Sequence, residues 1–323
     1  MNEMEKIEDI LDGVRTMGIG GHVRPDGDCV GSCMALYLYI KKYYPGIQVD
    51  VYLENPKPVF HYIDRFGEIR REEGEERSYD LFVTCDVSAL DRLAAARGHF
   101  ERAKKTACID HHVSNPGFAD VNHVCGEVGS ACEVLYGLLD PAKIDRSIAI
   151  ALYTGIVHDT GVFQYSSTTP QTMRIAASLM EHDFDFNRII DESFYQKTYL
   201  QNQVLGRVLA ESIMLLDGKC IVGYLKRRDM LFYNVQPADL DGIVSQLRLT
   251  QGVEVALFLY ESDSQIFRVS MRSNGAVDVS AIAVYFGGGG HVRAAGCDMA
   301  GSMYDVINNI TEQIIKQLPG QDE

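Results

Sequence analysis

The 323-residue sequence contains no apolar run near the roughly 20 residues that a membrane-spanning helix requires. Residues 1–12 are acidic and hold no apolar signal core, so we expect a cytoplasmic protein with no membrane partner. Cations are also scarce: 30 lysines and arginines against 45 aspartates and glutamates give a formal net charge of −15. Because binding to long nucleic acids depends on many phosphate contacts, this charge argues against a long nucleic-acid partner and leaves small phosphorylated ligands open.

The eight cysteines form no paired motif of the kind that binds zinc. Most lie inside apolar runs, as Cys85 and Cys132 do, which favours reduced thiols packed in a core. Cys29 and Cys33 are four residues apart and would share one helix face. We interpret them as packing residues, because no second cysteine pair accompanies them.

Short apolar strands alternate with amphipathic helices in the first half of the chain, the pattern of a mostly parallel sheet. We predict an α/β fold in which residues 1–190 form such a sheet, with helices on both faces. A helical linker is expected over 191–215, and a smaller C-terminal α/β domain over 216–323, with the active-site cleft between the two domains. The expected strands of the first domain are Met17–Val23, Gln48–Leu53, Leu81–Cys85 and Thr106–Ile109.

Aspartates and histidines follow the apolar runs of the first domain. They are His22, Asp26, Asp28, Asp86, Asp110, His111, His112, His158 and Asp159. A carboxylate buried alone costs several kcal/mol, so carboxylates gathered at one sheet edge need a compensating cation. Oxygen and imidazole ligands suit Mn²⁺ or a similar divalent ion. There are enough ligands for two such ions, which points to hydrolysis of a phosphate ester.

Each of these segments also has a simpler interpretation. Asp26-Gly27-Asp28 before a helix is a common capping turn, and Asp86 could cap a helix or close a turn. We interpret His158 as a structural histidine at a helix C-terminus. Residues 110–112 carry more weight, because three consecutive titratable residues after a buried strand have little packing rationale.

A second set of candidates lies in the C-terminal half. Gly287–Gly290 precede His291 and Arg293, and four glycines leave N–H groups open to a ligand phosphate. A flexible loop would also explain the glycines, but the small residues 294–296 that follow favour close approach to a ligand. Residues 272–274, Arg-Ser-Asn, follow the predicted strand Phe267–Met271 and could contact a nucleotide or form a strand-end turn.

Five motifs in this order resemble the DHH phosphoesterase superfamily over nearly the whole chain. They are His22–Asp28, Asp86, Asp110–His112, Gly155–Gly161 and the glycine-rich Gly287–Gly296, which is similar to the signature of the DHH-associated domain. Length and the two-domain layout resemble the stand-alone branch that contains nanoRNases and 3′-phosphoadenosine 5′-phosphate phosphatases. That resemblance implies hydrolysis of very short oligonucleotides or of the nucleotide bisphosphate by a water that two divalent ions, expected to be Mn²⁺, activate.

The resemblance also implies roles for individual residues. One ion would be bound by His22, Asp26 and Asp86, and the other by Asp28, Asp86, His111 and Asp159. Asp86 would thus bridge the ions, while Asp110 and His112 would complete the catalytic group by supporting or facing the substrate. The implied substrate-binding residues are Arg272, Ser273, Gly288, Gly289, Gly290 and His291.

Other functions stay open at this point. The substrate could be a cyclic dinucleotide, or a linear dinucleotide of the pApA or pGpG type. Inorganic pyrophosphate is a further candidate, although the glycine-rich motif fits a nucleotide better. A non-catalytic nucleotide sensor on the same scaffold belongs to a different class, and loss of a metal ligand would favour it. The oligomeric state is open as well, since the apolar helices of the first domain could support a homodimer.

Overall fold

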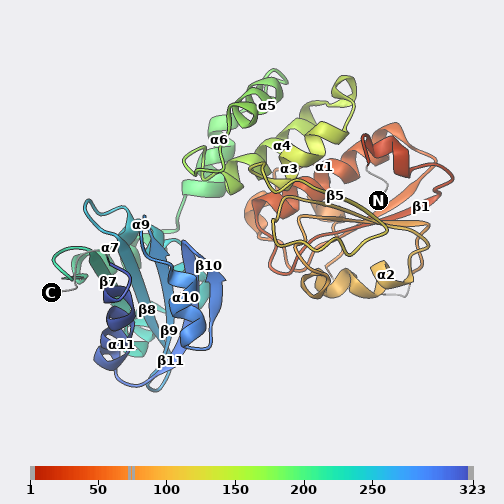
Figure 1. Ribbon diagram of the computed structural model, residues 1–323. Helices are drawn as coiled ribbons and strands as arrows, with labels where there is room; N and C mark the ends of the chain where they lie inside the picture. Colours follow the sequence, from red (N-terminus) through yellow and green to blue (C-terminus); the bar gives the residue numbers. More distant parts are fainter. Residues whose placement is uncertain (1–3, 72–73, 75–76, 319–323) are drawn as a thin grey trace. The chain divides into compact units, whose positions relative to one another are not determined.

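The computed structural model describes residues 4–71, 74 and 77–318, and its chain divides into two compact units at Gln196/Lys197 (Figure 1). The boundary falls inside the segment 191–215, which we predicted to be a linker. The helix α7 (Tyr199–Ala210) belongs to the second unit, where Val204 and Val208 pack into a core with strand residues. The cleft between the domains stays a prediction.

The first unit is built on a five-stranded sheet in which every pair of neighbouring strands is parallel. Its strands are β1 (Thr16–Gly20), β2 (Gln48–Tyr52), β3 (Leu81–Cys85), β4 (Thr106–Asp110) and β5 (Val121–Val124). Their order is β2-β1-β3-β4-β5, so the chain leaves β1 towards one side and returns at β3 on the other. In open α/β sheets, ligands bind outside the carboxyl ends of the strands at such a switch point.

Helices cover both faces of this sheet, as the sequence predicts. The helices of this unit are α1 (Gly27–Tyr43), α2 (Arg97–Arg102), α3 (Ala131–Leu138), α4 (Arg146–Asp159), α5 (Pro170–Met180) and α6 (Phe186–Ile190), of which α5 and α6 pack against α4. The larger core lies between the sheet and the layer of α1, α3 and α4. On the opposite face, Tyr52, Phe82 and Phe100 form an aromatic core beside α2, which Figure 1 shows on the far side of the sheet from α1.

Glycines let α1 and α4 approach each other closely. A Cβ atom on Gly31 would lie 2.5 Å from the backbone oxygen of Ala151, and one on Gly155 would lie 2.5 Å from Oδ1 of Asp28. Side chains at these positions would force the helices apart. The contact brings the first turn of α1, which holds Asp28, beside the last turn of α4, which holds Asp159.

The second unit is a six-stranded mixed sheet with helices on both faces. Its strands are β6 (Ile213–Leu215), β7 (Cys220–Leu225), β8 (Val255–Asp263), β9 (Ile266–Ser273), β10 (Gly289–His291) and β11 (Ala294–Ala300), in the order β10-β11-β9-β8-β7-β6. Besides α7, its helices are α8 (Arg227–Tyr233), α9 (Ile243–Arg248), α10 (Val279–Tyr285) and α11 (Met303–Ile315). The glycine-rich segment is therefore not a simple loop, because Gly289–His291 pair with β11.

One predicted helix of this unit is wrong in extent. The expected helix Pro237–Leu249 is a 3₁₀ turn, Pro237–Leu240, followed by the separate α9. Gly242 between them has φ of +88°, a left-handed conformation that interrupts a right-handed helix.

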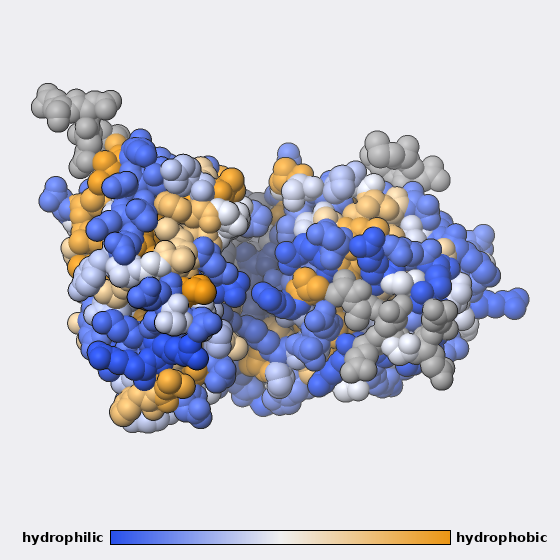
Figure 2. Space-filling model, turned by 90° about the horizontal axis from the view of Figure 1, so that it is seen from below, coloured by the Kyte–Doolittle hydropathy of each residue, from blue (hydrophilic) through white to orange (hydrophobic). Residues whose placement is uncertain are grey.

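The surface of the described residues is mainly hydrophilic, as the charged composition leads one to expect. Hydrophilic side chains dominate the face shown in Figure 2, and hydrophobic ones form separate small patches. Among the described residues, no helix combines the length and the apolarity that crossing a bilayer requires.

Candidate metal centre

The predicted acidic and histidine residues of the first unit meet at the carboxyl edge of its sheet. His22 follows β1, Asp86 follows β3, and Asp110 is the last residue of β4. Asp28 and Asp159 come from the adjacent ends of α1 and α4. The parallel strands bring these ends together because each strand enters the sheet in the same direction.

His22 presents one ring nitrogen to the carboxylates. Its Nδ1 lies 2.7 Å from the backbone oxygen of Val23, which makes Nδ1 the donor and leaves Nε2 to face the carboxylates. Nε2 faces Oδ2 of Asp86 at 3.3 Å and Oδ2 of Asp26 at 3.6 Å. A histidine that binds a metal commonly has its other ring nitrogen fixed in this way by a backbone oxygen.

Asp86 and His111 hold two buried atoms without a hydrogen-bond partner. They are Oδ1 of Asp86 and Nε2 of His111, which lie 3.5 Å apart. Nε2 of His111 is also 3.1 Å from Oδ2 of Asp159 and 3.9 Å from Oδ2 of Asp28. Buried polar atoms almost always have a partner, so this pair indicates a position that a cation would fill.

Asp86 adopts an unusual backbone conformation, with φ of +58°. A non-glycine residue in this region stores strain, and such strain clusters at functional sites. The turn directs the two carboxylate oxygens to different histidines, Oδ2 to His22 and Oδ1 to His111. One carboxylate thus faces both histidines, each through a separate oxygen.

Asp28 is fully buried and belongs to the first turn of α1 rather than to the preceding turn. Its oxygens accept hydrogen bonds from the N–H groups of Ala131, at 2.6 Å, and Cys132, at 2.9 Å, which open α3. Burial raises the pKa of Asp28, and the charges of Asp86 and Asp159 raise it further. A free carboxylate here therefore needs a positive charge beside it.

The histidines reflect the same excess of negative charge. Burial lowers the pKa of His111, but Asp159 and Asp86 outweigh it and raise this pKa well above the ordinary value. Burial also lowers the pKa of His22, and Cys29, Asp26 and Asp86 together raise it. The ring protons supply the positive charge that the carboxylates require, and divalent cations would take their place.

His112 lies beside the cluster and is oriented by Asp110. Its Nδ1 is 2.8 Å from Oδ1 of Asp110, a completely buried carboxylate, and this hydrogen bond raises the pKa of His112. The other oxygen of Asp110 accepts a hydrogen bond of 2.6 Å from Nδ2 of Asn115, which also donates to the backbone oxygen of Val87. Asn115 was not predicted, although its position three residues after His112 is a signal that could have found it.

Asp26 and Cys29 have contacts at the edge of the cluster that the sequence does not predict. Asp26 caps α1 through Oδ1, which accepts from the N–H groups of Asp28 and Cys29, and turns only Oδ2 towards His22. The ligand atoms of His22, Cys29 and Asp86 all lie within 4.8 Å of one another. Cys29, which we interpreted as a packing residue, is fully buried in the core of the first unit and also borders the cluster.

His158 does not join the cluster. Its Nε2 lies 2.9 Å from Oγ of Ser193, its ring packs against Phe60, and burial lowers its pKa to about 4. These contacts agree with a structural histidine. Among the residues that the structure describes, the other groups that could hold an ion are Asp86 with His111 and His112, and Asp28 with His111 and Asp159.

The predicted substrate-binding residues lie in the second unit. Arg272 and Ser273 point to opposite faces of β9, because Ser273 is buried and accepts a hydrogen bond of 3.2 Å from Nη1 of Arg293. His291 is exposed and pairs with Ala294, which in turn pairs with Arg272. Residues 288–290 run beside this row, so the structure gathers Arg272, His291 and the glycines and leaves Ser273 out.

Comparison with known proteins identifies both units. The profile of the DHH family, N-terminal domain, matches residues 16–156, and that of the DHHA1 domain matches residues 217–318. Two curated relatives are called bifunctional oligoribonuclease and PAP phosphatase NrnA. The one from Thermus thermophilus is 28% identical over 98% of this chain and 94% of its own length, and the one from Bacillus subtilis is 26% identical over 86% and 87%.

Solved structures share the fold. An exopolyphosphatase-related protein from Bacteroides fragilis superimposes with a TM-score of 0.86 at 22% identity, over 96% of this chain and 94% of its own. RecJ from Thermus thermophilus, crystallised with Mn²⁺, gives a TM-score of 0.52 at 13% identity, over 97% of this chain and 53% of RecJ.

Proposed function

The chain belongs to the DHH family of phosphoesterases, and within this class of hydrolases we propose that it acts on very short oligonucleotides and on 3′-phosphoadenosine 5′-phosphate. The names of the relatives that match nearly the whole chain support this choice of substrates. The acidic balance of the chain also favours short substrates. A cytoplasmic location is part of the same proposal.

The single observation that carries metal dependence is the pair of unpartnered buried atoms, Asp86 Oδ1 and His111 Nε2. We propose two divalent ions, with Mn²⁺ as the expected metal. His22, Asp26 and Asp86 would hold one ion, and Asp28, Asp86, His111 and Asp159 the other. Carboxylate oxygens and imidazole nitrogens at these separations fit such ions, since modest rotations of the side chains would bring them to bonding distance.

Two bound ions of this kind would lower the pKa of a water molecule and neutralise the developing charge on a phosphoryl group. The protein's own residues set the geometry of the reaction. Asp86 links the two histidines through its separate oxygens. The α3 N–H groups fix Asp28, so its carboxylate stays in place when a substrate enters.

His112 is placed to act on the substrate. Its Nδ1 is occupied by Asp110, and about a third of the side chain is exposed, which leaves Nε2 for a ligand. Because Asp110 raises the pKa of His112, Nε2 can carry a proton and donate it in a hydrogen bond to a phosphoryl oxygen. Charge on these oxygens disperses in the transition state, where such a donor contributes most.

A substrate panel with Mn²⁺ tests the proposal. It compares dinucleotides, a 24-mer, cyclic dinucleotides, 3′-phosphoadenosine 5′-phosphate and pyrophosphate, with a chelator as control. We expect turnover of the dinucleotides and the nucleotide bisphosphate and none in the chelator. Preference for cyclic dinucleotides, or binding without turnover of any member, would overturn it.

A further inference from the structure

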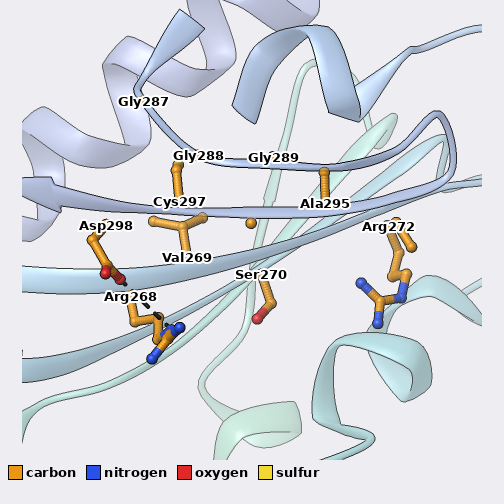
Figure 3. A pocket seen from close by; sticks show the side chains of 12 residues that line it. Arg268, Val269, Ser270, Arg272, Gly287, Gly288, Gly289, Ala295, Cys297 and Asp298 are labelled. Carbon is orange, nitrogen blue, oxygen red and sulfur yellow. Dashed lines mark ion pairs between the residues drawn. The ribbon is translucent and has the colours of Figure 1, made fainter. Parts of the chain in front are cut away.

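A cavity of about 550 Å³ lies against the sheet of the second unit (Figure 3). β9 and β11 form its floor, and the glycines that lead into β10 form its rim. Three of its lining residues, Arg272, Gly288 and Gly289, were predicted from the sequence as substrate contacts. Arg268, Ser270 and Asp298 also line it, and the function described above does not account for them.

The side chains of β9 alternate between a core and the face of the sheet that bears the cavity, although Val269 of the core also borders the cavity. Phe267, Val269 and Met271 are buried in the core that α10 and α11 cover. The intervening side chains, Arg268, Ser270 and Arg272, face the cavity instead. Figure 3 shows the two arginines at opposite ends of the cavity, with Ser270 between them.

The spacing of the two arginines suits an extended ligand. Four residues of an antiparallel strand span about 13 Å, so their guanidinium groups leave the floor about that far apart. Opposite Ser270 and Arg272 stand Gly296 and Ala294, which have almost no side chain. No bulky side chain of β11 therefore rises between the arginines, and a nucleotide can lie along this surface.

The rim of the cavity also lacks side chains at Gly288 and Gly289. A Cβ atom on Gly288 would lie 2.1 Å from the backbone oxygen of Gly296, so a side chain at 288 would break the pairing of this segment with β11. A Cβ atom on Gly289 would meet nothing within 4 Å. The backbone thus comes close to β11 while open space remains above it.

Arg268 forms a weak ion pair with Asp298, whose carboxylate would compete with a ligand anion for the guanidinium group. Its Nε lies 3.7 Å from Oδ1 of Asp298, which is directly opposite on β11, and both side chains are more than half exposed. Exposed ion pairs of this length contribute little, so a phosphate can replace the carboxylate at small cost. A guanidinium group also matches a phosphate in two parallel hydrogen bonds.

We propose that Arg268 forms a second phosphate subsite, which recognises oligonucleotides of three or more phosphates and not a nucleoside bisphosphate. The phosphates of the bisphosphate are attached to one ribose and reach only the Arg272 end of the cavity. A trinucleotide is long enough to reach both arginines. Asp298 stands beside Arg268 and repels phosphates of a longer strand, which limits the length that binds well. This inference rests on the proposed function and assigns its length preference to particular residues.

The test compares the full-length, Mn²⁺-loaded protein with Arg268→Ala and with the control Arg227→Ala. Arg227 is also an exposed arginine of this unit in an ion pair, with Asp263, and lies outside the cavity. We measure KM for a 5′-phosphorylated trinucleotide and for 3′-phosphoadenosine 5′-phosphate. Fluorescence anisotropy with a phosphorothioate-linked trinucleotide gives affinity independently of turnover, at several salt concentrations.

For Arg268→Ala we expect about tenfold weaker trinucleotide binding, the loss of one charge-assisted contact, with KM for the bisphosphate within twofold of wild type. The slope of log K against log salt should fall by about 0.7, the contribution of one phosphate contact in a single strand. Asp298→Asn should instead strengthen binding of the trinucleotide and of longer strands.

Three results would overturn the subsite. They are an equal loss for both substrates, no loss for either, and an equal loss in Arg227→Ala, which would reveal a general charge effect. A wild-type protein that processes neither substrate would contradict the proposed function itself. Normal wild-type turnover with no difference between the substrates in Arg268→Ala would contradict the subsite alone.

Discussion

Asp110→Asn should show whether the orientation of His112 matters to catalysis. The substitution keeps the shape of the side chain and removes its charge. In the wild type, Oδ1 accepts from Nδ1 of His112 at 2.8 Å and Oδ2 accepts from Nδ2 of Asn115 at 2.6 Å. An amide has only one oxygen, so one of these hydrogen bonds must be lost.

The cost of the substitution can be estimated for each of the two orientations of the new amide. If the amide oxygen keeps His112, its NH₂ group faces the NH₂ group of Asn115, and two buried donors are left opposed. If the amide turns, His112 must accept at Nδ1 and loses the tautomer that the carboxylate imposes. Either arrangement forfeits a hydrogen bond to a charged group, about 1.5–3 kcal/mol of stability. Misplacing a group that exchanges protons or hydrogen bonds in the transition state costs roughly 10²–10⁴-fold in rate.

The assay measures kcat, KM and bound Mn²⁺ for Asp110→Asn beside the control Asp120→Asn. Asp120 accepts two hydrogen bonds from Thr106 at the opposite end of β4. We expect Asp110→Asn to lose kcat with its metal content intact, and Asp120→Asn to lose only stability. Retention of more than half of the wild-type kcat would refute the orienting role, and loss of metal would place Asp110 among the ligands.

Four further predictions address the centre and its surroundings. Asp86→Ala should abolish turnover and lower bound Mn²⁺ in elemental analysis, and most of the rate surviving at saturating Mn²⁺ would exclude a bridging role. Glu133→Ala should weaken Mn²⁺ binding in calorimetric titration by about 10–100-fold, because Oε2 of Glu133 accepts from the N–H of Gly129 at 3.3 Å and so holds the turn that leads into α3, whose first N–H groups bind Asp28. Unchanged affinity would refute this. With wild-type protein, kcat/KM should fall from dinucleotides to a 24-mer, more steeply at low salt, whereas equal rates would favour a processive enzyme. Burial raises the pKa of Asp50, but Tyr79 and two arginines outweigh burial and lower this pKa. Asp50→Asn should therefore reduce the melting temperature at pH 7, and the difference from wild type should shrink as the pH falls below about 4. A difference that does not change with pH would contradict this linkage.

The metal centre could be predicted from sequence because local signals suffice for it. Each apolar run that ends in an aspartate or histidine specifies a buried strand and the residue at its exit. Parallel strands then bring their exits to one edge, whatever the length of the connections. For this reason His22, Asp86 and Asp110 were placed together without knowledge of the helices between them.

The residues that were missed depend on contacts between distant segments. We expect Glu133 to act on the centre through the segment that leads into α3, and Cys29 reaches the edge of the cluster because α1 packs against the sheet. Neither residue type marks a ligand at its position in the sequence. Asn115 differs, because a carboxylate in a buried strand end must find a donor, and the nearest side-chain amide was a reasonable candidate.

The separation of Ser273 from the other predicted substrate contacts has a more specific cause. Ending the strand at Met271 left Arg272 and Ser273 in a turn, where both side chains could face one ligand. β9 continues to Ser273, and its two-residue period sends neighbouring side chains to opposite faces. A difference of two residues in a strand boundary therefore separates Ser273 from Arg272, and the same period, applied backwards from Arg272, leads to Ser270 and Arg268.

The negative charges gathered at the candidate centre lower the stability of the metal-free fold and favour the binding of cations. Asp26, Asp28, Asp86 and Asp159 contribute four of the chain's negative charges within one small region, where burial raises the pKa of Asp28 and Asp159. Without cations, this repulsion is relieved by protons on the histidines. Cations that bind the folded state and not the unfolded chain stabilise it by mass action. The same carboxylates that weaken the metal-free fold would therefore give it affinity for the proposed divalent ions, and we expect the remaining negative charge of the chain to repel long polyanions.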